Sequence, residues 1–469
     1  MADIHTDYLI AGAGAVGLAF ADTLLTETDA DIVIVDRHGL PGGHWNDAYP
    51  FVALHQPSAF YGVNSMPLGS DRIDVGGLND GFLELASGAE VSAYFQRVMR
   101  ERLLASGRVR YFPLSELEHG TDGSHRLRSL LSGHQTTVQV RRRLVDATYY
   151  GTTVPSTHRP AFPVAEGAWL ATPNDLPQLW KHADRLPSNF ILLGAGKTAM
   201  DAAVYLLQCG APPDRIQWVR PRDSWMLNRR GTQPLMAFLE EVLGGQALQM
   251  EALTSAADAD DWFDRLEQGG QMLRLDRAVR PTMFHYATIS EGEIALLQQI
   301  TRVLRHGPVK AIESEALVFA DARIAVPPDS LFIDCTARAV TRRPPVPVYQ
   351  PQRIVLQMTR IPQPAFSAAL AAWLEAHGGD DAARNAMSIP VPLPDSVRDV
   401  PRAALVNLMN QGRWSQDARL RAWIRACRLD GFGKLIASVD PADAAKMAVL
   451  ARLRRAAEGL PAAAARWMR

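Results

Sequence analysis

Two stretches of this chain carry glycines at a spacing that lets the backbone approach a pyrophosphate group. Gly12, Gly14 and Gly17 follow a short apolar run in the order G-x-G-x-x-G, and Gly194 and Gly196 repeat the pattern with alanine in the third place. In this pattern the first glycine permits a tight turn, the second admits the pyrophosphate, and the third small residue lets a helix pack on the strand. The N-terminus of that helix offers unpaired N–H groups to the phosphates. We therefore predict two dinucleotide-binding sites.

The residues at the end of the next strand distinguish the two sites. After the first motif, DIVIVD closes on Asp36, whose carboxylate can accept the hydroxyls of an adenosine ribose and would repel a 2′-phosphate. After the second motif, RIQWV runs into Arg220 and Arg222, which favour a 2′-phosphate, and Arg229 and Arg230 could extend that basic pocket. The second site therefore indicates NADPH rather than NADH, unless these arginines are only surface charges.

A glycine pair and a tryptophan after Asp36 indicate which dinucleotide the first site binds. The segment LPGGHWNDAYP contains Gly42, Gly43 and Trp45 in a GG-x-W arrangement. Here the chain resembles the class B flavoprotein monooxygenases, which include flavin-containing monooxygenases, Baeyer–Villiger enzymes and N-hydroxylases. In that family GG-x-W passes beside the flavin, so the resemblance implies FAD in the first site. On local grounds alone, a glycine turn beside a core tryptophan is the alternative.

The order of the motifs extends the resemblance over roughly residues 5–390. The segment DATYYG at 146–151 resembles the strand end that closes the FAD domain in this family, and LFIDCTARA at 331–339 resembles a similar strand end that completes the NADPH domain. We expect cofactor contacts from one residue after each of these strands and from two residues at the start of the second motif's helix. These residues are Thr148, Thr336, Lys197 and Thr198.

The polar side chains that follow GG-x-W are the candidates for catalysis. The segment ALHQPSAFYGVNSMPLG sets His55, Gln56 and Asn64 among apolar residues. The resemblance implies that Asn64 supports a flavin C4a-hydroperoxide and NADP⁺, and we expect His55 or Gln56 to touch the flavin ring. An ordinary turn is the alternative for Asn64. The implied reaction is an FAD- and NADPH-dependent transfer of one oxygen atom from O₂ to a small-molecule substrate.

One stretch departs from the family and leaves another reaction open. Before its second glycine motif the family carries F-x-G-x-x-x-H-x-x-x-Y/D, whereas this chain reads FPVAEGAWLATPNDLPQLW, with Gly167 but no histidine. Thr172 or Asp175 could take over the role of linking the domains, and no arginine for Baeyer–Villiger chemistry can be assigned by motif. The alternative is an NAD(P)H-dependent flavin oxidoreductase or oxidase without oxygen insertion. A non-catalytic flavoprotein is disfavoured because both glycine motifs are intact.

These motifs predict an α/β fold with two Rossmann-like dinucleotide-binding domains and a helical C-terminal region. We expect the FAD domain at residues 1–182 and 336–390, and the NADPH domain inserted at 183–335. The C-terminal helices, at 391–469, are expected to pack on the FAD domain or to form a contact in a homo-oligomer. Residues 233–310 are expected to be largely helical, with SEGEIALLQQITRVLRHG as one long amphipathic helix, and to serve as a substrate lid or a plain embellishment.

Composition restricts the partners and the location. A formal net charge of -1 and a pI of about 6.9 create no overall field towards nucleic acid or anionic membranes. The three cysteines form no C-x-x-C pair, which fits a reducing cytoplasm and disfavours a disulfide reductase, and the twelve histidines show no metal-ligand spacing. The apolar run at 8–21 follows an acidic start and is interrupted by glycines. We interpret it as strand, turn and helix rather than as a signal peptide or membrane span.

Overall fold

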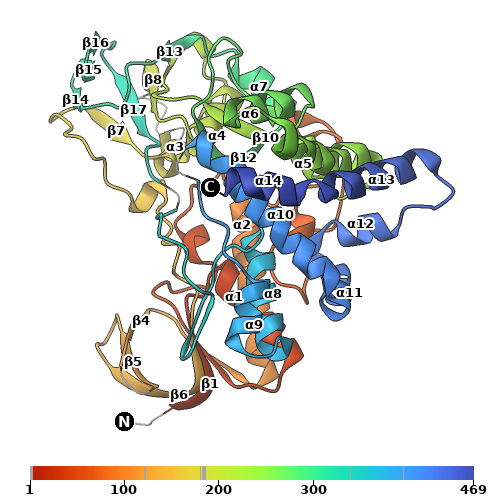
Figure 1. Ribbon diagram of the computed structural model, residues 1–469. Helices are drawn as coiled ribbons and strands as arrows, with labels where there is room; N and C mark the ends of the chain where they lie inside the picture. Colours follow the sequence, from red (N-terminus) through yellow and green to blue (C-terminus); the bar gives the residue numbers. More distant parts are fainter. Residues whose placement is uncertain are drawn as a thin grey trace.

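The computed structural model describes residues 4–120, 123–179, 181, 186–338, 340–394 and 396–468. Two sheets built mainly from parallel strands form the framework, one at the bottom and one at the upper left of Figure 1, and helices pack around both. The blue C-terminal part of the chain is helical (Figure 1). The predicted α/β fold class is therefore confirmed.

The first sheet has the strand order β18-β19-β6-β1-β2-β3, with β4 and β5 attached to β6. Its strands are β1 (Ile4–Ala11), β2 (Ile32–Val35), β3 (Val109–Phe112), β4 (Ser115–Glu118), β5 (Ser124–Ser129), β6 (Gln135–Asp146), β18 (Tyr349–Gln350) and β19 (Arg353–Val355). On one face, helices α1 (Ala15–Glu27) and α8 (Pro364–His377) bury β1 and β2, and on the other face the antiparallel β4–β5–β6 meander covers them. Burial on both faces explains why β2 and residues 8–11 of β1 are apolar.

The second sheet is parallel throughout and has the order β13-β9-β8-β17-β7. Its strands are β7 (Trp169–Ala171), β8 (Asn189–Leu193), β9 (Ile216–Val219), β13 (Arg302–Leu304) and β17 (Ser330–Asp334), and its neighbouring helices are α3 (Leu176–Leu179), α4 (Lys197–Gln208) and α7 (Glu291–Leu297). The expected domain boundary at residues 182 and 183 lies outside the described residues, and β7 enters the second sheet before it. After β17 the chain returns to the first sheet at β18.

The segment 233–310 is less helical than expected. It contains helices α5 (Gly245–Ser255), α6 (Ala259–Gln268) and α7, but also strands β11 (Met272–Leu273), β12 (Met283–Ile289) and β13. The expectation of one long helix through SEGEIALLQQITRVLRHG was wrong, because α7 ends at Leu297 and Arg302–Leu304 pair in parallel with β9. Hydrogen bonding to the edge of the sheet outweighs the local helical pattern here.

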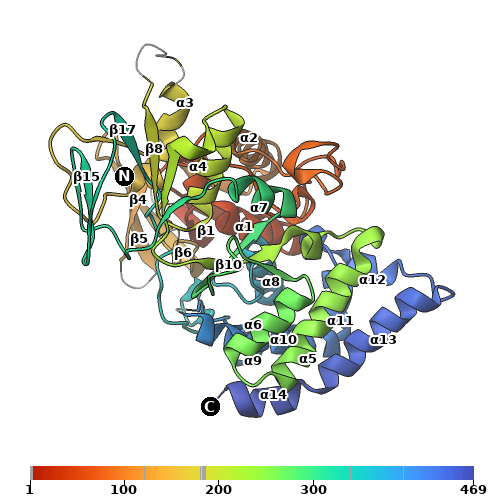
Figure 2. The same cartoon turned by 90° about the horizontal axis from the view of Figure 1, so that it is seen from above.

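Two small sheets and the C-terminal helices complete the fold. Strand β10 (Ser224–Asn228) pairs with β11 and β12, and a separate meander consists of β14 (Ala311–Glu313), β15 (Ala316–Val318) and β16 (Arg323–Ala325). The remaining helices are α2 (Gly88–Arg97), α9 (Asp381–Met387), α10 (Val400–Gln416), α11 (Ala418–Ala426), α12 (Gly433–Ala437), α13 (Ala444–Glu458) and α14 (Leu460–Trp467). Helices α13 and α14 pack against α5, as Figure 2 shows from above. Among the described residues, no helix combines the length and apolar character that a membrane crossing needs.

Candidate functional site

The first glycine turn lies between β1 and α1, and it demands glycine at two positions. Gly12 has φ = 105°, and a Cβ on it would lie 3.1 Å from Cγ2 of Thr148, while a Cβ on Gly17 would lie 2.0 Å from the Gly12 carbonyl oxygen. Gly14 is the N-cap of α1, where a Cβ would come within 3.5 Å of the Cα of Gly43. The structure therefore brings together the predicted contacts Gly12, Gly14, Gly43 and Thr148.

Asp36 ends the strand beside this turn and is already part of a hydrogen-bonded group. Its Oδ2 accepts from the backbone N–H of Ala13 at 2.6 Å, and its Oδ1 accepts from the backbone N–H of His38 at 2.7 Å. The His38 ring bridges Asp36 at 3.0 Å and Asp47 at 2.7 Å. Burial alone would lower the pKa of His38, but the hydrogen bonds to Asp47 and Asp36 raise it.

The Asp36 carboxylate can still receive a ribose. A carboxylate offers about four lone-pair positions, and the protein uses three of them, one through a side-chain ring that can be displaced. The residues therefore fit an adenosine ribose at this point. Sequence reasoning missed His38 and Asp47, although a histidine two residues after the acid is visible in DRH.

Trp45 is half-buried beside the first core rather than fully inside it. Its indole Nε1–H donates to the hydroxyl of Tyr61 at 2.8 Å, and burial raises the pKa of the Tyr61 phenol. The contact fixes the GG-x-W segment against the loop at 58–64, so these two stretches form one wall.

The second glycine turn repeats the first between β8 and α4. Gly194 has φ = 120°, and a Cβ on it would lie 2.8 Å from the carbonyl oxygen of Cys335. A Cβ on Gly196 would meet no atom of the described residues within 4 Å, so none of these residues fills the space beside it at the N-terminus of α4. The turn can therefore admit a pyrophosphate.

The strand ends that close the two sites also repeat each other. Oγ1 and the backbone N–H of Thr148 donate to Asp146 Oδ1 at 2.7 and 2.9 Å. Oγ1 and the backbone N–H of Thr336 donate to Asp334 Oδ1 at 2.6 and 2.9 Å. Both threonines thus sit in identical turns directly beside their glycine turns, as the DAT and DCT sequences suggest.

Arg220 does not offer a free guanidinium to a phosphate. It is buried, its Nη2 lies 3.4 Å from Oδ2 of Asp223, and its guanidinium stacks over the Trp218 ring at 5.2 Å. Burial lowers the pKa of Arg220. The paired Asp223, three residues further along, was visible in the sequence but had not been weighed.

A different basic cluster lies at the carboxyl edge of the second sheet. Arg222 follows β9 and Arg338 follows β17, the two strands that flank β8 and its glycine turn. His285 joins them, with its Nε2 3.4 Å from Nη2 of Arg342. Burial, and after it the positive charges of Arg342, Arg222 and Arg338, lower the pKa of His285. Of the arginines expected to favour a 2′-phosphate, only Arg222 belongs to this cluster, and sequence reasoning missed its other members.

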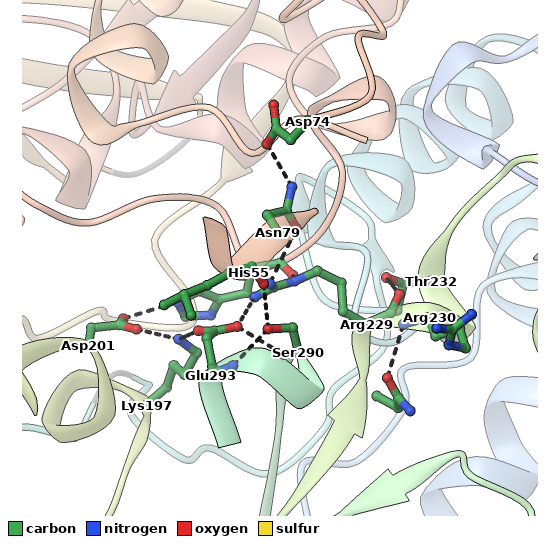
Figure 3. A network of polar contacts seen from close by, with 12 residues as sticks. His55, Asp74, Asn79, Lys197, Asp201, Arg229, Arg230, Thr232, Ser290 and Glu293 are labelled. Carbon is green, nitrogen blue, oxygen red and sulfur yellow. Dashed lines mark hydrogen bonds and ion pairs between the residues drawn. The ribbon is translucent and has the colours of Figure 1, made fainter. Parts of the chain in front are cut away.

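Along α4 lies a cavity of about 180 Å³ that we call the seam pocket. Helices α4 and α7 form one side of it, and the segments at 51–55 and 78–79 form the other. Its charged side chains make a continuous network (Figure 3). Lys197 contacts Asp201 and, at 3.0 Å, Glu293, while Arg229 Nη2 lies 2.6 Å from the other Glu293 oxygen. No group of three or more His, Cys, Asp or Glu side chains suited to a metal ion occurs within the part of the chain that the structure describes.

All four charges of this network remain ionised despite their burial. Burial is the largest single influence and raises the pKa of Glu293 and of Asp201. The charge of Lys197 outweighs it only together with Arg229 for Glu293 and with His55 for Asp201, which holds the pKa of Glu293 at about 2 and that of Asp201 still lower. For Lys197, burial lowers the pKa and the two carboxylates raise it above its ordinary value. The Lys197 ammonium, predicted to bind the cofactor, is therefore occupied by Asp201 and Glu293.

His55 is the predicted catalytic residue that the structure brings to the seam pocket. Its Nε2 lies 3.3 Å from Asp201 Oδ2, which also accepts from the Tyr49 hydroxyl at 2.7 Å. Thr198, expected at the cofactor, lies close to the Tyr49 hydroxyl. Gln56 does not line the pocket.

Asn64 lies elsewhere, against the C-terminal region. Its Oδ1 accepts from the backbone N–H of Arg428 at 2.9 Å. The half-buried Arg428 guanidinium donates to the carbonyl oxygens of Ala59, Tyr61 and Val63, at 2.5, 2.7 and 2.6 Å. The loop that carries Asn64 is thus held by a residue far away in the sequence, and no local signal reveals this.

The stretch that lacks the family histidine still joins the two halves of the molecule. Thr172 donates from N and Oγ1 to Asp175 Oδ2 at 2.8 Å, which caps a helical turn. Inside that turn, Nδ2 of Asn174 donates to the Asp47 carbonyl oxygen at 3.1 Å. The link is therefore made by Asn174, with Thr172 and Asp175 holding its turn.

Relatives among known proteins share most of the chain. No known family model matches it. The uncharacterized protein Rv2000 of Mycobacterium tuberculosis is 43% identical over 433 residues, which cover 92% of this chain and 79% of the relative, and the uncharacterized protein Mb2023 of Mycobacterium bovis matches equally well.

Solved structures with a similar fold include monooxygenases. The polycyclic ketone monooxygenase of Thermothelomyces thermophila matches with a TM-score of 0.52 and 14% identity, covering 99% of this chain and 89% of its own. An open structure of cyclohexanone monooxygenase matches with a TM-score of 0.51 and 10% identity, covering 87% of this chain and 98% of its own. The chain therefore belongs to one family with the mycobacterial proteins, and its fold is that of the class B flavoprotein monooxygenases.

Proposed function

We propose that this protein is an FAD- and NADPH-dependent monooxygenase that transfers one oxygen atom from O₂ to a small-molecule substrate. The observation that carries the proposal is the pair of glycine turns at the carboxyl edges of two sheets, one beside a carboxylate and the other beside a basic cluster. The shared fold supports it. Bound FAD would accept a hydride from NADPH and activate O₂.

The first site is suited to FAD by shape and by charge. Gly12, Gly14 and Gly43 let the backbone surround a pyrophosphate, and Asp36 has a lone pair left for the adenosine ribose. Trp45 and its partner Tyr61 would form the wall beside the flavin. The carboxylate beside the ribose disfavours a 2′-phosphate here.

The second site is suited to NADPH through residues other than Arg220. Arg222, Arg338 and Arg342 bring three guanidiniums near His285, and two of them follow the strands on either side of β8 and its glycine turn. A 2′-phosphate placed among them would gain charge-assisted hydrogen bonds. It would also raise the pKa of His285 by opposing the three positive charges.

The domain assignment follows the two sheets. We assign β1 to β6 with β18, β19 and α8 to the FAD-binding domain, and β7 to β17 to the inserted NADPH-binding domain. The C-terminal helices then connect the two, because α10 and α14 share a core with α5 and α6 while Arg428 holds the loop at 59–64. The three free cysteines fit the cytoplasmic location expected from composition.

The test combines cofactor content, reductant choice and product. Purified protein should carry FAD, be reduced faster by NADPH than by NADH, and incorporate one atom of ¹⁸O₂ into a product when a panel of small substrates is offered. Protein that binds no FAD, or that NADPH does not reduce, contradicts the proposal. Reduction followed by release of H₂O₂ alone across the panel would favour the flavin oxidase instead.

Gly196→Val is the variant that tests the reductant site. The added side chain would project into the pyrophosphate space without meeting protein, and the φ of −82° at this position suits any residue. FAD content should stay unchanged while reduction by NADPH is lost. Gly412→Val is the matched control. A Cβ at Gly412 also meets no described atom within 4 Å, but this residue belongs to α10 and not to a glycine turn.

A further inference from the structure

The seam pocket contains four buried charges, and each is neutralised inside the protein. The side chains of Lys197, Asp201, Glu293 and Arg229 are 9%, 14%, 9% and 3% exposed, and every one has an oppositely charged partner in the network of Figure 3. A charged ligand would lose its hydration shell on entry and find no unpaired counter-charge. The pocket therefore selects against ions of either sign.

Nδ1 of His55 is one of the polar atoms in the pocket that remain available to a ligand, as is the exposed amide of Gln208. Asp201 is ionised, so its Oδ2 can only accept, and Nε2 of His55 must carry the hydrogen that is donated to it. In the neutral imidazole, Nδ1 is then the acceptor. No protein group among the described residues hydrogen-bonds to this Nδ1. A ligand that carries one hydrogen-bond donor can satisfy it.

The size and the walls of the pocket limit the rest of the ligand. An engineered, enclosed cavity of about 150 Å³ accommodates benzene, and the seam pocket, which is open to solvent on one side, has a volume of about 180 Å³. Its apolar lining includes Phe51, stacked on Tyr205 at 4.2 Å, together with Leu78 and Val204. A single ring with one small substituent matches this volume.

We infer that the seam pocket binds an uncharged molecule of single-ring size whose one hydrogen-bond donor is accepted by Nδ1 of His55. Asp201 acts as a positioning residue, because it sets the tautomer of His55. The inference depends on the proposed function at one point, the identification of this ligand as the substrate. Binding is measured without turnover, so the binding site and the proposed function can be refuted separately.

Four probes separate charge from hydrogen bonding in the oxidised holoenzyme. They are aniline (uncharged, with a donor), toluene (similar size, without a donor), benzoate (anionic) and benzylammonium (cationic), compared by calorimetry at mildly alkaline pH. Aniline should bind about three- to tenfold more tightly than toluene, which corresponds to one net hydrogen bond. Neither ion should bind at concentrations that saturate the protein with aniline. Equal binding of either ion, or no preference for aniline over toluene, would overturn the inference.

Asp201→Asn tests whether Asp201 sets the tautomer of His55, because a purely structural role of Asp201 would not change which probe the pocket prefers. Lys197 donates to the side of Asp201 that faces away from His55, so the amide oxygen of the variant should stay there and its NH₂ should face His55 Nε2. The tautomer of His55 then reverses, and Nδ1 becomes a donor. The variant should lose its preference for aniline and prefer benzaldehyde, a probe that only accepts.

Two controls protect this experiment from a folding artefact. Asp214→Asn makes the same change on an exposed aspartate away from the pocket and should keep the wild-type preference. His55→Phe keeps the charge network and should bind aniline and toluene alike. An unchanged aniline preference in Asp201→Asn would refute the role of Asp201.

A competition experiment decides whether the substrate or the nicotinamide ring of NADP⁺ occupies the seam pocket. If saturating NADP⁺ excludes aniline, the space belongs to the nicotinamide and the substrate assignment is overturned. If aniline binds equally well with NADP⁺ present, the assignment stands. A protein that binds aniline as described but does not oxidise NADPH would refute the proposed function and leave this binding site intact.

Discussion

Replacing Lys197 with methionine should destabilise the protein because it leaves one buried carboxylate without a counter-charge. Glu293 would keep Arg229 at 2.6 Å and the backbone N–H of Ser290 at 2.9 Å. Asp201 would keep only two neutral or weak partners, the Tyr49 hydroxyl at 2.7 Å and the His55 ring at 3.3 Å. The cost should therefore come mainly from Asp201.

The expected magnitude follows from what remains around Asp201. Removing one partner of a buried ion pair costs about 3 to 5 kcal/mol, and the two surviving hydrogen bonds favour the lower end, about 3 kcal/mol. That corresponds to a change of roughly 100-fold in the folding equilibrium. In the double variant Lys197→Met/Asp201→Asn both charges are gone and the amide can still bond to Tyr49 and His55. Its stability should return to within about 1 kcal/mol of the wild type.

The effect should also depend on pH in a defined direction. The charge of Lys197 is the main influence that lowers the pKa of Asp201, against a burial effect that raises it. In the wild type, ionised Asp201 contributes stability above its ordinary pKa of about 3.9, and this is lost only as the pH falls through the lower folded value. Without Lys197 the pKa of Asp201 should rise above its ordinary value, so the destabilisation should shrink as the pH falls and the carboxyl group becomes protonated.

Urea unfolding of the wild type, both single variants and the double variant measures this coupling. The midpoints are comparable only where the slope of the transition is unchanged. Lys446→Met is the matched control, because Lys446 pairs with Asp443 at the N-terminus of α13, where solvent screens the charges and the pair should contribute little. A double variant no more stable than Lys197→Met alone would refute the account of an uncompensated carboxylate.

Three further predictions concern the cofactor sites and the C-terminal region. Arg338→Ala should weaken NADPH binding about 10- to 100-fold by removing a charge-assisted contact, while NADH binding serves as the internal control; equal losses for both would exclude a 2′-phosphate role. The pKa of His38 is raised in the folded protein. Its contribution to the free energy of unfolding should therefore be complete below about pH 6.5 and disappear as the pH rises through the pKa of the folded state. His38→Gln should flatten the dependence of the unfolding free energy on pH in this range. Arg428→Met should lower the free energy of unfolding by about 2 to 3 kcal/mol, because removing the guanidinium leaves three carbonyl groups without a donor. The control in the same urea assay is Arg425→Met, a change at an exposed arginine that should have little effect.

The amino-acid sequence by itself determined the local frame of both nucleotide sites. A buried strand, a turn that only glycine can adopt at Gly12 and Gly194, and an Ala-rich helix are neighbours in the chain. Their conformations depend on short-range sterics and on apolar patterning, which are readable without knowing what packs on them. The position of Asp36 is also readable from the sequence, because it is the residue directly after its strand.

Only the tertiary structure decided which charges are free and which are paired. Arg220 is buried and paired with Asp223, which its place after the strand does not reveal. Arg338 follows a strand far along the chain and comes to the same sheet edge as Arg222 only because β9 and β17 both pair with β8. His55 and Asn64 are close in the sequence but have different partners in space. His55 contacts Asp201 in the seam pocket, whereas Asn64 is bound by Arg428 of the C-terminal region. Electrostatic interactions act through distance in space and depend on burial, so the order of residues along the chain does not encode them locally.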